Sequence, residues 1–357
     1  MFAHQISPIM NKHMQRIFFG SPGTGKSHRI VYEIIPNYLG ILESTNPENI
    51  IKTVFHPEYT YGDFMGKLVP ITRKERVEYK YYEGHFLKAL SRAYKNIVDA
   101  HDKNGVQISE PKNVALVIDE INRGNSSGIF GTVFQLLDRD ENGWSSYGIN
   151  ITELEFRSLL ELMKVELYEK DGKIEKYELH PFNAVTLKNF EEKIKFLRID
   201  LESRTIRIPP NLSILATMNT SDNSIYFMDS AFKRRWDWEF VNWDNSKPAK
   251  ATYGKEGELD EHEWIKLITN LNNFIKSYHT LIRGIEDKQI GYYFIKQPVT
   301  AEQIQNKLMF FLWDSVFHRD KEPLIKLLNV TKNNLVTFGD FIKLHNILIT
   351  NIMNLSK

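Results

Sequence analysis

One short segment of the sequence has the residue types and spacing of a loop that binds phosphate groups. It consists of Gly20, Ser21, Pro22, Gly23, Thr24, Gly25, Lys26 and Ser27. Its three glycines let the backbone curl so that successive N–H groups point inward. We expect Lys26 to reach the β- and γ-phosphates of a nucleotide and the Ser27 hydroxyl to ligate Mg²⁺. A glycine-rich turn with a chance lysine is the alternative, but an apolar run before the loop and a helical pattern after it favour phosphate binding.

Two adjacent carboxylates, Asp119 and Glu120, follow a second apolar run. Buried at a strand end, they would be costly without a cation. We therefore expect Asp119 to hold the Mg²⁺ shell and Glu120 to polarise an attacking water. The alternative is a strand that ends in a solvated acidic turn.

A third apolar run ends in polar residues, in the segment ILATMNTSDNSIYFMDSAFKRRWDWEF. An amide at the strand tip, Asn219, can position a water and sense a phosphate, and Asp222 is close enough in sequence to join that water network. An asparagine and a threonine at a strand end are otherwise typical of a turn or cap.

Two consecutive arginines, Arg234 and Arg235, come soon after this tip. A guanidinium can stabilise the charge that develops on a phosphoryl group during transfer. Supplied by a neighbouring subunit, it would make hydrolysis depend on assembly. The alternative is a pair of surface arginines at a helix end, and the spacing leaves open which of the two would act.

The elements that must position these residues alternate between strands and helices. We predict buried strands at 16–19, 50–55, 114–119, 212–218 and 236–241, separated by helical patterns. This alternation is typical of an α/β domain with a mainly parallel sheet, whose ligand lies at the carboxyl ends of the strands. We expect the α/β core to span 1–243, with an insertion at about 145–205, and a helical subdomain to span 244–357.

Composition narrows the class of protein further. The 357 residues carry a formal charge of +1 and no cysteine, which excludes disulfides, cysteine metal sites and a thiol nucleophile. No apolar run approaches the roughly 20 residues that a membrane-spanning helix needs, and the first residues lack a signal-peptide pattern. We expect a cytoplasmic protein without membrane contact.

Taken together, the motifs resemble the McrB branch of AAA+ motors, the nucleotide-driven subunits of modification-dependent restriction systems. The resemblance is carried by GSPGTGKS, VIDEINRGN, ATMNTSDNSIYFMDSAFKRRW, DKQIGYYF and VFHPEYTYGDFMGKLVP, and it covers residues 16–144 and 206–295. It implies an AAA+ core with the strand order 5-1-4-3-2 and hydrolysis of GTP or ATP with Mg²⁺. It also implies a homo-hexameric ring, a McrC-like subunit that activates hydrolysis and carries or recruits a nuclease, and contact with DNA through the assembly.

The resemblance assigns roles to individual residues. Asn219 and Asp222 correspond to the signature element of the family, and Arg234 or Arg235 to the arginine that acts on a neighbouring subunit. Asn122 and Arg123 would face a subunit interface or a partner.

The sequence departs from the family in three ways. Asn223 stands where the family usually has an arginine, which makes ATP a serious competitor of GTP. Only 15 residues precede Arg16, so we expect a DNA-reading module to be supplied by another subunit or to have been removed. The segment 145–205 is longer than the usual loop, and we interpret it as a solvated hairpin, with DNA or partner contact as the alternative.

Two further functions compete with the ring motor of a restriction complex. A MoxR-type or dynein-related AAA+ ATPase that remodels protein partners would use the same hydrolytic residues. A nucleotide-binding scaffold without turnover would not need Lys26, Glu120, Asn219 and Arg234 together. The asparagine–threonine–serine–aspartate element favours the restriction motor.

Overall fold

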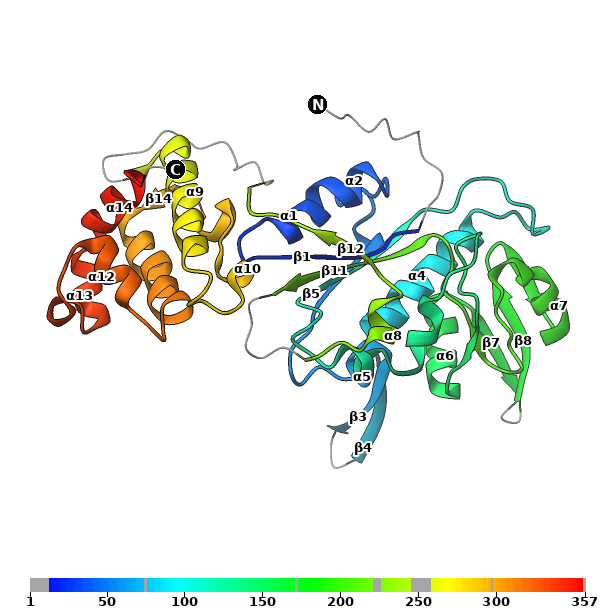
Figure 1. Cartoon of the computed structure of the whole chain (residues 1–357). Helices are drawn as coiled ribbons and strands as arrows, with labels where there is room; N and C mark the ends of the chain where they lie inside the picture. Colours follow the sequence, from blue (N-terminus) through cyan, green and yellow to red (C-terminus); the bar gives the residue numbers. More distant parts are fainter. Residues whose placement is uncertain are drawn as a thin grey trace. The chain divides into compact units, whose positions relative to one another are not determined.

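The computed structural model describes residues 13–73, 76–170, 173–220, 226–244, 258–296 and 298–355 (Figure 1). The chain divides into two compact units. The first comprises Met1–Ile17, Ser27–Met218 and Ser224–Trp238, and the second comprises Phe18–Lys26, Asn219–Asn223 and Glu239–Lys357. The phosphate-loop segment before Ser27 therefore groups with the C-terminal residues, although it is far from them in sequence.

A five-stranded sheet has the order β12-β1-β11-β5-β2. Its strands are β1 (Gln15–Gly20), β2 (Ile50–Val54), β5 (Val114–Asp119), β11 (Leu212–Asn219) and β12 (Asp237–Phe240). Each strand predicted from the sequence is confirmed to within one residue at either end. The β11–β5 and β2–β5 pairs are parallel, so Asp119 and Asn219 both stand at carboxyl ends.

Helices and a hairpin accompany the strands of the first unit (Figure 1). They are α1 (Lys26–Arg29), a π-helical turn at 30–34, α2 (Ile35–Asn37), α3 (Tyr61–Phe64), the hairpin β3 (Gly66–Arg73) with β4 (Arg76–Glu83), α4 (His85–Asp99), α5 (Ser126–Phe130) and α8 (Ser230–Lys233). The longest of them, α4, packs on β2 and β5. Its apolar residues recur on one face, and Phe86, Leu90 and Ala93 are fully buried there.

The insertion at 145–205 is a folded part of the first unit. It contains β6 (Ile149–Asn150), α6 (Glu153–Leu162), the antiparallel sheet of β7 (Glu166–Lys170), β8 (Lys173–Leu179) and β9 (Phe182–Val185), α7 (Leu187–Lys193) and β10 (Thr205–Ile206). Its buried side chains, Leu159 and Phe190 among them, join the same apolar core as the sheet. The insertion is therefore more than the solvated hairpin that we expected from the sequence. The hairpin is one part of it, and the rest packs on the apolar core of the first unit.

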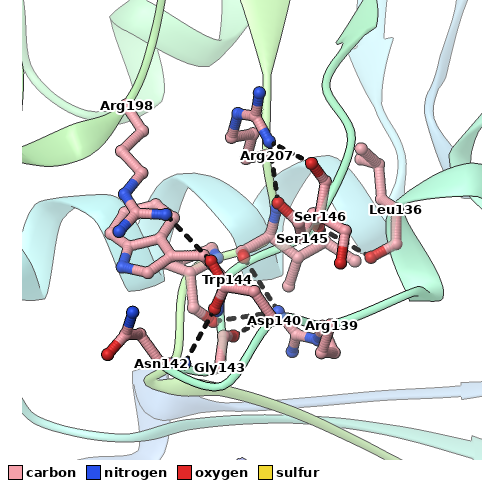
Figure 2. A network of polar contacts seen from close by, with 12 residues as sticks. Leu136, Arg139, Asp140, Asn142, Gly143, Trp144, Ser145, Ser146, Arg198 and Arg207 are labelled. Atoms are coloured by element: carbon pink, nitrogen blue, oxygen red, sulfur yellow. Dashed lines mark hydrogen bonds and ion pairs between the residues drawn. The ribbon is translucent and has the colours of Figure 1, made fainter.

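Two arginine side chains, those of Arg139 and Arg207, donate hydrogen bonds to backbone carbonyls near the ends of this insertion (Figure 2). Arg139 Nη1 donates to the carbonyl oxygens of Gly143 (3.1 Å) and Ile208 (2.8 Å), and Nη2 donates to that of Leu212 (2.7 Å). Arg207 donates to two further carbonyls, those of Ser145 and Ser146. Burial lowers the pKa of the Arg139 guanidinium to about 9, so it remains charged at neutral pH and its donors need these acceptors.

Replacement of Arg139 by methionine is expected to destabilise the first unit by about 3 kcal/mol or more, because buried carbonyl oxygens lose a charged donor. Urea-induced loss of tryptophan fluorescence would measure the change. The control is Arg198→Ala in the same network, where a half-exposed guanidinium pairs with Asp140 at 3.1 Å. That variant should cost less than about 1 kcal/mol. Equal losses in both variants would contradict a special role for Arg139.

The second unit is largely helical after residue 258. It contains β13 (Glu258–Leu259), α9 (Glu261–Ser277), α10 (Ile285–Lys288), β14 (Val299–Thr300), α11 (Ala301–Gln303), π-helical turns at 304–309 and 311–316, α12 (Glu322–Leu328), α13 (Phe338–Lys343) and α14 (His345–Met353). Asp260 begins α9 with a capping box to Glu263. A separate apolar core surrounds the fully buried Trp264 and Leu271. In the described part of the chain, helices that combine the length and apolarity needed to cross a bilayer are absent.

Candidate functional site

The phosphate loop adopts the backbone conformation that its glycines predict. Gly23 and Gly25 have φ angles of 75° and 82°, in the left-handed region that side-chain-bearing residues rarely adopt. Lys26 is buried, and its Nζ donates to the carbonyl oxygens of Gly20 (3.0 Å) and Ser21 (2.8 Å). The ammonium group therefore lies against the same loop whose backbone N–H groups are expected to bind a phosphate.

A segment of the second unit packs on this loop through its backbone. The N–H of Gly291 donates to Pro22 O (3.0 Å), and the N–H of Tyr293 donates to Gly23 O (2.9 Å). A Cβ atom on Gly291 would lie 2.2 Å from Gly23 O, so only glycine fits there. The role of this segment was not visible in the sequence beyond its place in the family resemblance.

Helix α9 holds the segment in place. The fully buried Asn272 accepts from Ile290 N (3.0 Å) and donates to Ile290 O (2.8 Å). Trp264 Nε1 donates to Tyr292 O at 2.8 Å. The helical core is thereby connected through residues 290–293 to the phosphate loop.

The residues expected to hold Mg²⁺ lie together. Ser27 Oγ donates to Asp119 Oδ1 at 2.9 Å. The described residues contain no group of three or more histidine or carboxylate side chains that could enclose an ion by themselves. A hydroxyl and one carboxylate fit Mg²⁺, which keeps several waters and takes its remaining oxygens from substrate phosphates.

A threonine that the sequence did not single out lies between the two acidic residues. Thr217 Oγ1 donates to Asp119 Oδ1 (2.8 Å) and accepts from Glu120 N (3.2 Å). Glu120 itself has a φ angle of 55°, which is uncommon for a residue with a side chain. Such backbone strain is typical of functional sites.

The strand tip of β11 is only partly described. Asn219 ends the strand and is half-buried, whereas Asp222 and Asn223 lie outside the described residues. Asn122 is 1% exposed and its carbonyl accepts from Tyr226 N at 3.0 Å. Of the two residues that the resemblance places at a subunit interface or a partner, Asn122 is buried in this chain and Arg123 is exposed, and the interface role stays a prediction.

The two consecutive arginines have different surroundings. The Arg235 guanidinium contacts Asp138 Oδ2 through Nε (3.0 Å) and Nη2 (2.8 Å), and it lies 3.9 Å from the centre of the Phe134 ring. Arg234 directly follows α8 and is exposed. Among the described residues no hydrogen-bond or ion-pair partner of the Arg234 side chain is found. A helix end thus presents one arginine outward and folds the other inward.

The parallel sheet, the phosphate loop and the acidic strand end are features of P-loop proteins. Over 354 residues the chain is 27% identical to the type II restriction enzyme BsuMI component YdiS of Bacillus subtilis, covering 92% of this chain and 84% of that protein. It is also 23% identical over 225 residues to the EcoKMcrB subunit of the type IV methyl-directed restriction enzyme of Escherichia coli, covering 62% of this chain and 34% of that protein. The resemblance to McrB-type AAA+ proteins is therefore confirmed.

Two other comparisons add little. No protein-family model matches the chain. A crystal structure of a candidate ATPase from Cytophaga hutchinsonii aligns with 74% of this chain and 47% of its own, at 14% identity and a TM-score of 0.23, which is too low to indicate a shared overall arrangement.

Proposed function

We propose that this chain is an AAA+ nucleoside triphosphatase that hydrolyses GTP or ATP as the ring motor subunit of a DNA restriction complex. The observation that carries the proposal is the contact between Ser27 of the phosphate loop and Asp119 at the end of β5. These two side chains meet although 92 positions separate them in sequence. A hydroxyl and a carboxylate brought together beside a glycine-rich loop are what a magnesium-bound triphosphate requires.

The sheet order supports the AAA+ assignment. Numbered along the chain, the five strands β12-β1-β11-β5-β2 read 5-1-4-3-2. In this order the strand that bears Asn219 stands between the phosphate-loop strand and the strand that bears Asp119. Parallel strands open their carboxyl ends at one edge of a sheet, where such folds bind their ligands.

The proposed reaction is attack of a water oxygen on the γ-phosphorus, with cleavage of the bond between that phosphorus and the β–γ bridging oxygen. The backbone N–H groups of the loop and Lys26 bind the phosphates. Glu120 orients the water and takes its proton, and Asn219 holds the water or a γ-oxygen. Ser27 and Asp119 would hold Mg²⁺, which would supply positive charge to the phosphate groups when bound. The products are a nucleoside diphosphate and inorganic phosphate.

Of the two arginines, we propose Arg234 as the one that acts on the nucleotide of a neighbouring subunit. The guanidinium of Arg235 is already held by Asp138 and stacked on Phe134. Beside Arg234, the ammonium of Lys233 lies 4.9 Å from the centre of the Phe227 ring, and Phe227 is 86% exposed. An exposed phenylalanine with a lysine ammonium over its ring is suited to contact with another chain.

The assembly that this surface would serve is a homo-hexameric ring with a McrC-like nuclease subunit, acting on DNA. The names of the two relatives support a restriction function, because both are components of restriction enzymes. The proposal includes a contribution of Asp222 to the site, as the family signature implies.

Steady-state hydrolysis of ATP and of GTP, each with and without DNA and a candidate McrC-like nuclease subunit, tests the proposed function. We expect turnover of at least one nucleotide, with a rate that rises when the nuclease subunit and DNA are added. Hydrolysis that responds to a folded protein client and not to DNA or the nuclease would favour a remodelling ATPase. Absence of turnover under all conditions would contradict the proposal.

Replacement of Gly291 by alanine is expected to weaken nucleotide binding by about tenfold or more, because a Cβ 2.2 Å from Gly23 O forces the phosphate loop to move. Titration with a fluorescent nucleotide analogue would measure the dissociation constant. Gly339→Ala is the matched control, since its Cβ would meet Thr337 Oγ1 at an ordinary 3.5 Å. Unchanged affinity in Gly291→Ala would show that the segment does not shape the loop.

A further inference from the structure

Thr217 occupies a distinctive place in the sheet. The parallel pairing of β11 with β5 runs from Leu212 opposite Val114 to Ala216 opposite Ile118. Thr217 is the next residue along β11, and it is buried. At this point β5 ends and the chain turns at Asp119 and Glu120, so Thr217 stands directly beside the turn.

Three hydrogen bonds join Thr217 to three successive residues of that turn. Its hydroxyl donates to Asp119 Oδ1 at 2.8 Å and accepts from Glu120 N at 3.2 Å, and its carbonyl accepts from Ile121 N at 3.0 Å. Because a backbone N–H can only donate and an ionised carboxylate can only accept, the direction of both hydroxyl bonds is fixed. The single proton of the hydroxyl therefore points at Asp119.

These bonds constrain the two acidic residues in different ways. The bond to Asp119 uses Oδ1, the same oxygen that accepts from Ser27, and no donor to Oδ2 is recorded within the described ranges. The bond from Glu120 N anchors a backbone whose φ angle is 55°. Without that anchor, the strained peptide would be free to relax and turn the Glu120 side chain away.

We propose that Thr217 is a positioning residue that sets the orientation of both Asp119 and Glu120 through one hydroxyl group. The inference rests on the proposed function, because it assigns to these carboxylates the magnesium and water roles. In this assignment Thr217 acts through the two acidic residues that it contacts and not on the substrate itself. It acts by holding one carboxylate toward the ion and by fixing the backbone from which the other reaches the water.

Two substitutions separate the hydroxyl from the rest of the side chain. Thr217→Val keeps the branched shape and removes both hydroxyl bonds, whereas Thr217→Ser keeps the hydroxyl and removes a methyl group. In the assembled complex, kcat of Thr217→Val should fall about 10- to 100-fold, while that of Thr217→Ser stays within about threefold of wild type. KM for the nucleotide should change less than kcat, because the phosphate loop is untouched.

Two readouts are independent of turnover. Fluorescent-nucleotide binding by Thr217→Val should need about tenfold more Mg²⁺ for half-saturation. Amide hydrogen exchange of a peptide spanning 119–122 should lose protection in Thr217→Val and keep it in Thr217→Ser. Thermal unfolding would show whether either variant is misfolded, and a misfolded valine variant would be replaced by Thr217→Ala in the same measurements.

The possible outcomes distinguish this inference from the proposed function. Wild-type magnesium dependence and wild-type exchange in a folded Thr217→Val would refute the positioning role, as would equal losses in the valine and serine variants. Wild-type protein that binds magnesium nucleotide but never hydrolyses it would refute the proposed function. In that case a shift of the magnesium dependence, seen only in the valine variant, would still support the positioning role.

Discussion

Arg234→Ala is expected to lower the nucleotide turnover of the assembled complex by about 10³-fold or more, the range that loss of an arginine finger costs in related phosphoryl-transfer enzymes. The physical reason is that an exposed guanidinium, supplied by one subunit, would stabilise the charge developing on the γ-phosphoryl group of the next. Nucleotide affinity and thermal stability of the isolated chain should stay near wild type, because Arg234 is exposed at the end of α8. Turnover is measured by phosphate release at saturating nucleotide.

The neighbouring arginine provides the matched control. Arg235 is 10% exposed and paired with Asp138 at 2.8 Å. Arg235→Ala should therefore destabilise the chain by about 1–2 kcal/mol, because the mostly buried guanidinium loses its hydrogen bonds to the partly exposed Asp138 and its packing on Phe134. If Arg235→Ala abolished turnover in a fully stable protein, and Arg234→Ala did not, the assignment of the two residues would have to be exchanged.

Mixing two inactive variants tests whether Arg234 acts between subunits. In a mixed assembly, some interfaces have an Arg234→Ala subunit on one side, which supplies an intact phosphate loop and Glu120. A Glu120→Gln subunit on the other side supplies an intact Arg234, so such an interface contains every proposed group. A mixture of these variants should regain part of the wild-type turnover, whereas each variant alone stays inactive. Failure of every mixing ratio, with assembly verified by light scattering, would place Arg234 on the nucleotide of its own subunit or outside the site.

Glu120→Gln is expected to bind nucleotide with nearly wild-type affinity and to lower kcat by about 10²- to 10⁴-fold, the usual contribution of a general base. The amide keeps the size of the side chain but is not a base for the attacking water. Single-turnover hydrolysis and fluorescent-nucleotide titration measure the two effects separately. Such a variant should also accumulate in a nucleotide-bound assembly.

A distant glutamate controls for the loss of one negative charge. Glu175 is exposed on β8, within the insertion, and Glu175→Gln should leave both nucleotide affinity and kcat unchanged. Lys26→Ala completes the comparison, since it should weaken binding itself and not stall a bound state. Wild-type turnover in Glu120→Gln would mean that the acidic strand end does not activate water.

Much of the fold and the site could be predicted because their signals are local. Each core strand is a short apolar run between turn residues, and burial on both faces requires such a run whatever the neighbouring strands are. The phosphate loop needs glycines where its backbone enters the left-handed region, and Gly23 and Gly25 are found there. The meeting of Ser27 with Asp119 followed from placing two strand ends at one edge of a parallel sheet.

The insertion shows where local signals were insufficient. Its lysines, glutamates and tyrosines indicated a solvated hairpin, yet Leu159 and Phe190 are buried in the common core. The charged residues on the outer faces of β7 and β8 dominate the composition of this segment. The apolar residues of the flanking helices were therefore not recognised as part of the core from the sequence. The carbonyls that Arg139 gathers lie up to 73 positions away from it, so no pattern along the chain could have paired them.

The sequence by itself determined the chemical groups: the phosphate loop, the two carboxylates and the pair of arginines. Only the tertiary structure decided which arginine is buried, that Gly291 lies against the loop, and that Thr217 joins Asp119 to Glu120. The physical reason is that a threonine in a strand, a glycine in a loop and adjacent arginines are ordinary at the level of sequence. Their roles arise from partners that are distant along the chain and that folding brings within hydrogen-bonding distance.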